Sequence, residues 1–364
     1  MKILYVITGL RHGGAEKLLL LTCKHLKEAY PVEIVVCYFD PYAPMQTLFA
    51  EAGIETHCIR RNLFTVFRLA RIIRERKINI VHTHLIHADI YGRIAALLPR
   101  HLKPGVFSTA HGTEWFRWRK SPYCALVRRF DRWLSLPRNS RIIAISGSVR
   151  EMLIRNQNIA PDKISLLYNA VEVPGSMPVR RQREPGSVFR ILYVGRLAPE
   201  KNISCLIRAV ARLRDIPVEL TLVGEGKMAK VLHQEIETLG LAQKVRMPGA
   251  CLAPDGYYAT HDLFVLPSTH EGLGIVILEA FCHGLPVIGS RVDGILELLR
   301  EERGLLFDSD DDAQLAEQIN TLYTHSDLCE TLGQRGYEYA RQNHDMRNYV
   351  KILMQWYREG MLNN

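Results

Sequence analysis

The chain has 364 residues, of which 47% are hydrophobic and 23% are charged; this composition is typical of soluble globular proteins and excludes collagen-like and disordered classes. The net charge of +9 is uneven, because residues 1–171 hold 26 Lys and Arg against 12 Asp and Glu, whereas residues 172–364 hold 21 against 26. A basic first half indicates that this half meets an anionic partner.

Signals for secretion, membrane insertion and metal binding are missing from the sequence. No apolar run reaches the roughly 18 residues of a membrane span, and the run after Lys2 is short for a secretion signal. The eight Cys residues lie at none of the short spacings of zinc or redox sites, so we expect reduced thiols packed in a cytoplasmic protein.

One short apolar pattern occurs twice. Residues 2–6 read Lys-Ile-Leu-Tyr-Val and residues 190–194 read Arg-Ile-Leu-Tyr-Val, and a Gly and a helical pattern follow each run. Strand, helix and strand in succession indicate a parallel sheet with helices on its faces. We therefore predict an α/β fold with two similar doubly wound domains.

The other elements continue this alternation along the chain. The predicted strands occupy residues 2–6, 32–36, 78–82, 106–109, 141–144, 190–194, 218–223, 263–266 and 286–289. The predicted helices occupy residues 15–26, 64–77, 204–213, 313–322 and 348–362. The segment 173–187 is rich in Pro and Gly, which is typical of an interdomain linker.

Acidic residues precede the helix predicted over 313–322. Asp310, Asp311 and Asp312 match the Asp-x-Asp pattern of metal-dependent sugar transferases, but no nucleotide-binding loop signal comes before them. Negative charge is favourable at a helix N-terminus. We therefore interpret this run as a helix cap.

The most informative segment is residues 267–280, where a strand is followed by a Gly-containing turn and an apolar helix. Unpaired N–H groups at such a helix start form an anion site, which glycines let a phosphate approach. Two carboxylates flank it, Glu271 before the turn and Glu279 in the helix. The helix rises about 7.5 Å from Gly274 to Glu279, comparable with a diphosphate plus one sugar ring, so the two carboxylates suit hydroxyls on either side of a diphosphate.

A second loop follows the repeated strand at residues 190–194 and carries two bases. Arg196 can grip a phosphate with two hydrogen bonds, and Lys201 can neutralise it as a point charge. Two bases in a loop are usually solvated when considered alone. Their place after the repeated strand favours a clamp for a diphosphate.

These motifs resemble glycosyltransferase family 4, the retaining enzymes with the GT-B fold. The resemblance rests on Glu271 and Glu279, with seven residues between them, and on Gly-Arg-Leu-x-x-Glu-Lys-Asn at 195–202. It extends over nearly the whole chain through short motifs at residues 13–16, 82–84, 111–112, 146, 168–172, 223–226 and 304–307. The chain departs from the family pattern at Ala170, at Glu172 and within residues 292–297.

The resemblance implies two Rossmann-like domains that face a central cleft. Residues 1–172, with a C-terminal helix at about 345–364 that crosses back, would bind the acceptor. Residues 188–344 would bind the nucleotide-sugar donor, and residues 173–187 would link the two. No metal is expected, because fixed cations and a helix N-terminus replace it. No cofactor is expected either, since the nucleotide diphosphate sugar is a substrate.

The resemblance also implies roles for individual residues. Arg196 and Lys201 would bind the diphosphate and stabilise the departing nucleotide, and Glu279 would hold the ribose. Glu271 would contact the donor sugar, and His111 would reach it from the first half. These implied roles make the expected catalytic residues Glu271, His111, Arg196 and Lys201. The expected donor-binding residues are Arg196, Lys201 and Glu271 again, together with Gly13, Gly14, Gly272, Leu273, Gly274 and Glu279.

Two features of the first half bear on the donor. The glycines Gly13 and Gly14 open the first helix, where their amides either face a ligand or form a tight turn. His111 follows the strand at 106–109, and ligands of open α/β sheets lie outside such strand ends. We interpret His82 and His84 as packing and loop residues.

Aromatic and basic residues alternate after His111. Trp115, Arg117, Trp118, Arg119 and Lys120 suit an anionic membrane surface or a lipid-linked anionic acceptor. Nucleic acid binding is a rival interpretation, and a solvated helix with inward Trp residues is another. We interpret the helix predicted over 64–77 as an ordinary solvated helix; it carries Arg68, Arg71, Arg74 and Arg76.

We expect a retaining glycosyltransferase that uses a nucleotide diphosphate sugar, with UDP-sugars favoured over GDP-sugars. The expected acceptor is a saccharide, lipid-linked, at the inner face of the cytoplasmic membrane, with peripheral attachment and no nucleic acid partner. A nucleotide-sugar 2-epimerase of the same fold and a non-catalytic binding protein are the alternatives. A dinucleotide enzyme is disfavoured, because neither half has a full G-x-G-x-x-G with a downstream acid.

Overall fold

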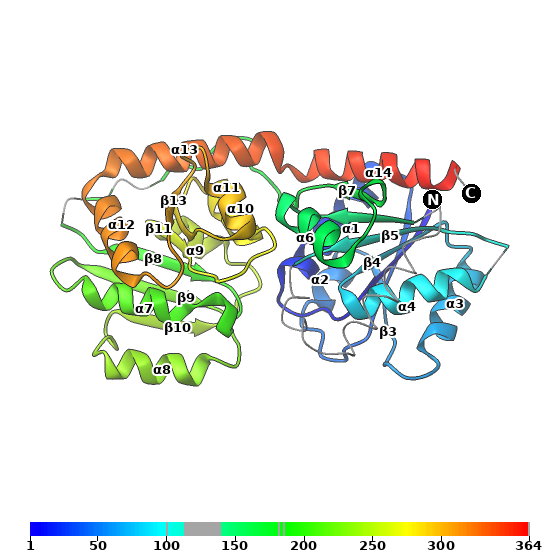
Figure 1. Cartoon of the computed structure of the whole chain (residues 1–364), viewed down its shortest axis with the longest axis horizontal. Coiled ribbons are helices and arrows are strands. Elements are labelled where there is room, and N and C mark those ends of the chain that lie inside the picture. The colour runs from blue at the N-terminus through cyan, green and yellow to red at the C-terminus, as the bar shows by residue number, and fades with distance from the viewer. Residues whose placement is uncertain (100, 113–139, 181–182, 185, 363–364) are drawn as a thin grey trace. The chain divides into compact units, whose positions relative to one another are not determined.

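The chain is described by a computed structural model that covers residues 1–99, 101–112, 140–180, 183–184 and 186–362. It divides into two units, each built around a sheet of parallel strands (Figure 1). The first unit comprises Met1–Asn169 and Met346–Asn364, and the second comprises Ala170–Asp345.

The first unit has a seven-stranded sheet in the order β3-β2-β1-β4-β5-β6-β7. Its strands are β1 (Lys2–Ile7), β2 (Glu33–Tyr38), β3 (Glu55–Cys58), β4 (Ile80–His84), β5 (Gly105–Ala110), β6 (Ser140–Ala144) and β7 (Ile164–Leu166). Its described helices are α1 (Gly14–Ala29), α2 (Gln46–Glu51), α3 (Thr65–Arg76), α4 (Ile86–Leu97), α6 (Gly147–Gln157), the short η2 (Pro161–Lys163) and α14 (Met346–Leu362).

The second unit has a six-stranded sheet in the order β10-β9-β8-β11-β12-β13. Its strands are β8 (Phe189–Val194), β9 (Val218–Val223), β10 (Val245–Gly249), β11 (Leu263–Leu266), β12 (Val287–Ser290) and β13 (Leu305–Phe307). Its helices are the short η3 (Pro199–Lys201), α7 (Ile203–Arg212), α8 (Ala229–Thr238), α9 (Asp255–Thr260), α10 (Ile275–Cys282), α11 (Asp293–Leu299), α12 (Asp312–Thr324) and α13 (Ser326–Asn343).

The two sheets share one topology, which confirms the doubly wound architecture predicted from the sequence. Strand order reverses between β1 and β4 in the first unit, and between β8 and β11 in the second. Residues that follow these strands therefore lie at a topological switch point, where ligands of such sheets bind. The central strands are apolar because helices cover both faces; residues 3–7 of β1 are completely buried.

The sequence prediction is least accurate at the ends of elements. Strand β4 begins at Ile80, two residues after the predicted start. The apolar residue Ile78 belongs instead to the end of α3, where Lys77 is left-handed and the Ile78 N–H donates to the Ile73 carbonyl at 3.0 Å. None of the helices in the described ranges is both long and apolar enough to cross a bilayer.

Candidate functional site

Two loops at the switch point of the second unit, one after β8 and one after β11, carry most of the residues expected to bind the donor. The first loop follows β8 and packs, backbone against backbone, on the loop after β9. The N–H of Leu197 donates to the Glu225 carbonyl at 2.8 Å. A Cβ atom on Gly224 would lie 1.9 Å from the carbonyl oxygen of Gly195, so only glycine fits there. This packing fixes the position of Arg196 and of the turn η3 that follows.

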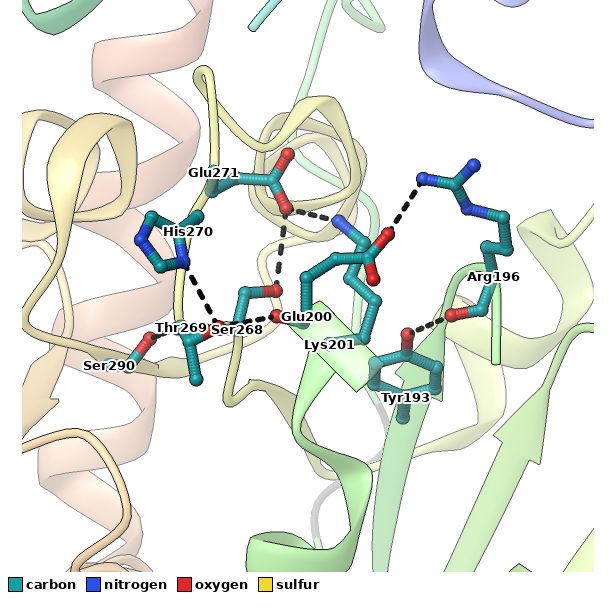
Figure 2. A network of polar contacts seen from close by, with 9 residues as sticks. All are labelled: Tyr193, Arg196, Glu200, Lys201, Ser268, Thr269, His270, Glu271 and Ser290. Atoms are coloured by element: carbon teal, nitrogen blue, oxygen red, sulfur yellow. Dashed lines mark hydrogen bonds and ion pairs between the residues drawn. The ribbon is translucent and has the colours of Figure 1, made fainter. Parts of the chain in front are cut away.

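Lys201 and Glu271 come together at this switch point, although they are far apart in the sequence. The Lys201 ammonium, at the end of η3, forms an ion pair with Oε2 of Glu271, and the two side chains are only 16% and 17% exposed (Figure 2). The hydroxyl of Ser268 donates to the same carboxylate oxygen at 3.4 Å. Glu271 is therefore held at the start of the loop that leads to α10.

Arg196 lies beside this pair but is more accessible. Its Nη2 donates to Glu200 Oε1 at 3.1 Å, and its side chain is 58% exposed. The backbone of Glu200 accepts a hydrogen bond from the Thr269 N–H at 2.8 Å, which ties the two loops together (Figure 2). Below the loop, the buried Tyr193 hydroxyl donates to the Arg196 carbonyl at 3.0 Å, and burial raises the pKa of Tyr193 well above its usual value. The guanidinium is therefore accessible to solvent although it is paired with Glu200.

The start of α10 depends on two glycines. Gly274 caps the helix with a φ of +88°, a backbone conformation that favours glycine. Gly294, in the first turn of α11, presses on the loop so closely that a Cβ atom there would lie 2.4 Å from the carbonyl oxygen of Gly272. Its N–H donates to the Glu271 carbonyl at 3.2 Å. The sequence identified Gly274 but not the support that Gly294 provides.

Glu279 lies on α10 and is 8% exposed. The buried hydroxyl of Tyr258 donates to Glu279 Oε2 at 2.8 Å. Burial, and next the charge of Glu279, raise the pKa of Tyr258 well above its usual value, so this phenol stays protonated as a donor. The ring of His283 stacks on Tyr258 with centroids 5.2 Å apart. Sequence reasoning missed Tyr258, because an isolated tyrosine carries no motif.

The glycines of the first unit lie at the N-terminus of α1. Gly13 is the cap residue and Gly14 is the first residue of the helix. A Cβ atom on Gly13 would lie 2.3 Å from Oε2 of Glu16, a carboxylate that is itself buried. An acidic group of the chain therefore already lies against the helix start, where negative charge is favourable.

Three histidines gather in the first unit: His82 and His84 lie in β4, and His111 follows β5. His84 Nδ1 and His111 Nε2 are hydrogen-bonded at 2.8 Å, and His82 Nε2 is bonded to the Thr109 hydroxyl at 2.7 Å. Burial lowers the pKa of His111 to about 4, that of His82 to about 3, and that of His84 well below its usual value. All three rings are thus neutral near pH 7. His82 is a buried packing residue as expected, whereas the contact between His84 and His111 was missed.

The acidic run at 310–312 has the structural role expected from the sequence. The Asp311 side chain caps α12 by accepting a hydrogen bond from the N–H of Gln314 at 2.9 Å. Asp312 forms ion pairs with Arg208 and Arg212 of α7. Within the described residues, no three His, Cys, Asp or Glu side chains are grouped so that they could hold a metal ion.

The expected acceptor and membrane residues lie outside the part of the chain that the structure describes. These residues are Trp115, Arg117, Trp118, Arg119 and Lys120.

Two relatives of known function align with more than half of the chain. The first, 28% identical, is the Escherichia coli UDP-Gal:alpha-D-GlcNAc-diphosphoundecaprenol alpha-1,3-galactosyltransferase, with 66% of this chain and 65% of that protein aligned. The second, 31% identical with 56% of each chain aligned, is the Campylobacter jejuni N-acetylgalactosamine-N,N'-diacetylbacillosaminyl-diphospho-undecaprenol 4-alpha-N-acetylgalactosaminyltransferase. Both alignments span less than two thirds of the relative. The structure of Anabaena Alr3699/HepE in complex with UDP and glucose is similar, with a TM-score of 0.84, 23% identity and 98% of both chains covered.

Two family models cover most of the chain, one for each half. The model described as Glycosyltransferase Family 4 matches residues 12–173, and the model described as Glycosyl transferases group 1 matches residues 179–339. The structural likeness confirms the GT-B fold expected for two such halves. The chain therefore belongs to the group 1 glycosyltransferases of the family 4 type, as its motifs predicted.

Proposed function

We propose that this chain is a retaining glycosyltransferase that moves a sugar from a nucleotide diphosphate sugar, preferably a UDP-sugar, to a saccharide acceptor. The observation that carries this proposal is the ion pair between Lys201 and Glu271, with the accessible guanidinium of Arg196 beside it. A cation for phosphate and a carboxylate for sugar hydroxyls thus lie next to each other at a switch point.

The two bases would act on the diphosphate. Arg196 is accessible and can exchange Glu200 for a phosphate, to which its planar guanidinium donates two hydrogen bonds. Lys201 would share its charge between Glu271 and the phosphate that bears the sugar. Negative charge grows on this phosphate as the glycosidic bond breaks, so fixed cations stabilise the transition state more than the ground state. Such a site needs no metal ion.

The two carboxylates would orient the donor. Glu271 keeps one carboxylate oxygen on Lys201 and Ser268, and its other oxygen would accept hydrogen bonds from sugar hydroxyls. The N–H groups of Gly272 to Gly274 would assist it at the start of α10. Glu279 would accept hydrogen bonds from the ribose, while Tyr258 holds its carboxylate in place.

The first unit would contribute a neutral imidazole. His111 hydrogen-bonds to His84, and burial keeps its pKa at about 4, so it would meet the sugar as a hydrogen-bonding group without charge. The amides of Gly13 and Gly14 would approach the donor only if the Glu16 carboxylate makes room.

The acceptor is proposed to be lipid-linked, in polysaccharide or glycolipid assembly at the inner face of the cytoplasmic membrane. Two observations support this. The names of two relatives specify diphosphoundecaprenol-linked acceptors. The first half of the chain also carries a large excess of basic residues, which suits an anionic lipid surface and does not require nucleic acid.

A donor panel tests the proposal. UDP- and GDP-sugars are incubated with the purified chain and undecaprenyl-diphosphate-linked saccharides, with a chelator present, and released nucleoside diphosphate is measured. We expect release from a UDP-sugar that requires acceptor and survives the chelator. Acceptor-independent formation of a new sugar nucleotide would indicate a 2-epimerase. Binding without any turnover across the panel would leave only a binding protein.

A further inference from the structure

The start of α3 and the turn before it expose three large apolar side chains, two of which belong to the helix that the sequence indicated to be an ordinary solvated one. Leu63 is 90% exposed, Phe64 is 63% exposed and Phe67 is 62% exposed. The helix already buries another face through Thr65, Leu69 and Ile73. Its outward face is therefore apolar at one end. Soluble proteins rarely expose such apolar patches, and those that occur mark interaction sites.

The same face is strongly basic. Residues 60–77 contain seven Lys and Arg and a single Glu. Phe64, Phe67, Arg68, Arg71 and Arg74 are three or four residues apart, so they share one side of the helix. Glu75 pairs with Arg71, and Glu55 of β3 pairs with Arg76. Within the described residues, the exposed side chains of Arg60, Arg68 and Arg74 form no ion pair, whereas Arg61 interacts electrostatically with Asp40.

The patch lies at the end of the sheet where ligands are expected. Its first residues follow β3, and they line an open hollow together with Tyr91 and with Phe39 and Pro41, which follow β2. Arg60 and Arg61 lie in the wall of this hollow, and Leu63 lies at the same place. Two guanidinium groups in a hollow beside exposed apolar side chains suit a phosphate headgroup whose acyl chains are close by.

We propose that residues 60–74 form a docking surface for an anionic lipid bilayer, with Leu63, Phe64 and Phe67 inserted among the headgroups. The Arg side chains would bind lipid phosphates around them. Rings and cations on one helix face are the pattern of interfacial binding. A second copy of the chain is a poorer partner, because it would bring a second set of five arginines against the first. The biological role of this surface rests on the proposed function, because an enzyme with a lipid-linked acceptor must reach the bilayer.

Vesicle flotation tests the surface. The full chain is mixed with vesicles of phosphatidylcholine alone, or of phosphatidylcholine with phosphatidylglycerol, at low and high salt. The apolar variant changes Leu63, Phe64 and Phe67 to Ser, and the basic variant changes Arg60, Arg61, Arg68 and Arg74 to Gln. The control variant changes Val231, Leu239 and Leu252 to Ser; these side chains of the second unit are 51%, 40% and 44% exposed.

We expect the parent to bind only the vesicles that contain phosphatidylglycerol, and salt to weaken this binding without abolishing it. The basic variant should lose about fivefold in affinity for each arginine removed. The apolar variant should lose at least about tenfold and should release completely at high salt. The control variant should bind like the parent, and thermal unfolding should show that all variants are folded.

Three results would overturn the proposal. In the first, the parent does not bind anionic vesicles. In the second, both patch variants bind like the parent, which would assign the binding to another surface. Loss of self-association without any loss of vesicle binding would make the patch an interface between copies of the chain. The vesicles contain no donor and no acceptor, so these results do not depend on whether the chain transfers a sugar.

Discussion

Replacing Lys201 by Ala should damage the stability and the activity of the chain for different reasons. The change leaves the Glu271 carboxylate, 17% exposed, without its cation. Exposed ion pairs contribute about 0–1 kcal/mol, whereas breaking a fully buried pair costs about 3–5 kcal/mol. The limited exposure of this pair places the expected loss in free energy of unfolding at about 2 kcal/mol. For a unit of this size, that loss lowers Tm by roughly 4–8 °C.

The double variant Lys201→Ala, Glu271→Gln separates the two effects. Removing the stranded charge should restore at least about half of the lost stability, because the penalty belongs to the unpaired carboxylate. Turnover should not recover. Loss of one fixed charge at a developing anion costs at least about 10²-fold in turnover, and the double variant lacks the same cation.

Differential scanning calorimetry and release of nucleoside diphosphate measure the two quantities on the same samples. Lys227→Ala, an exposed lysine of the same unit, is the matched control and should change neither. If Lys201→Ala kept full turnover while folded, Lys201 would have no role in the chemistry. If the double variant were as unstable as the single variant, the ion pair would not be the source of the loss.

Three further predictions concern neighbouring features. Glu279→Gln should weaken the binding of free UDP by about tenfold, as measured by calorimetry. Tyr258→Phe should weaken it less, because the Glu279 carboxylate remains. Equal UDP affinity in Glu279→Gln and the parent would give Glu279 a purely structural role. Gly294→Ala should lower both Tm and donor affinity, because its new Cβ atom meets loop backbone at 2.4 Å; unchanged values would show that the loop adapts freely. Thermal stability should fall as pH falls from about 6.5 toward 4, because the unfolded histidines bind protons that the buried ones, such as His111 with a pKa of about 4, do not. His84→Asn should flatten this slope, and a slope that the change leaves intact would assign it to other groups.

The sequence predicts the parts of the molecule that depend on local pattern. The strands at residues 190–194 and 263–266 match β8 and β11, and the loops after them were identified from their glycines and bases. Apolar periodicity and turn residues act over a few positions, so they are visible in a single sequence. The same logic identified the run at 310–312 as a helix cap, and the structure gives that role to Asp311.

Features that depend on distant segments were not predictable in this way. Lys201 and Glu271 are 70 residues apart, and only the order of strands brings their loops together. Tyr258 and Gly294 act through contacts with other loops and carry no motif of their own. On α3, the sequence indicated an ordinary solvated helix, but it did not reveal that Phe64 and Phe67 are exposed to solvent while Leu69 and Ile73 are buried.

The most direct test of the central claim is proton NMR of the reaction of the purified chain with a UDP-sugar and a lipid-linked saccharide acceptor, in the presence of a chelator. We expect a new glycoside with the same anomeric configuration as the donor, formed together with UDP and without added metal. Lys201→Ala should slow the growth of this signal by at least about 10²-fold. A product with inverted configuration, or a reaction that requires Mg²⁺ or Mn²⁺, would refute retention without a metal ion.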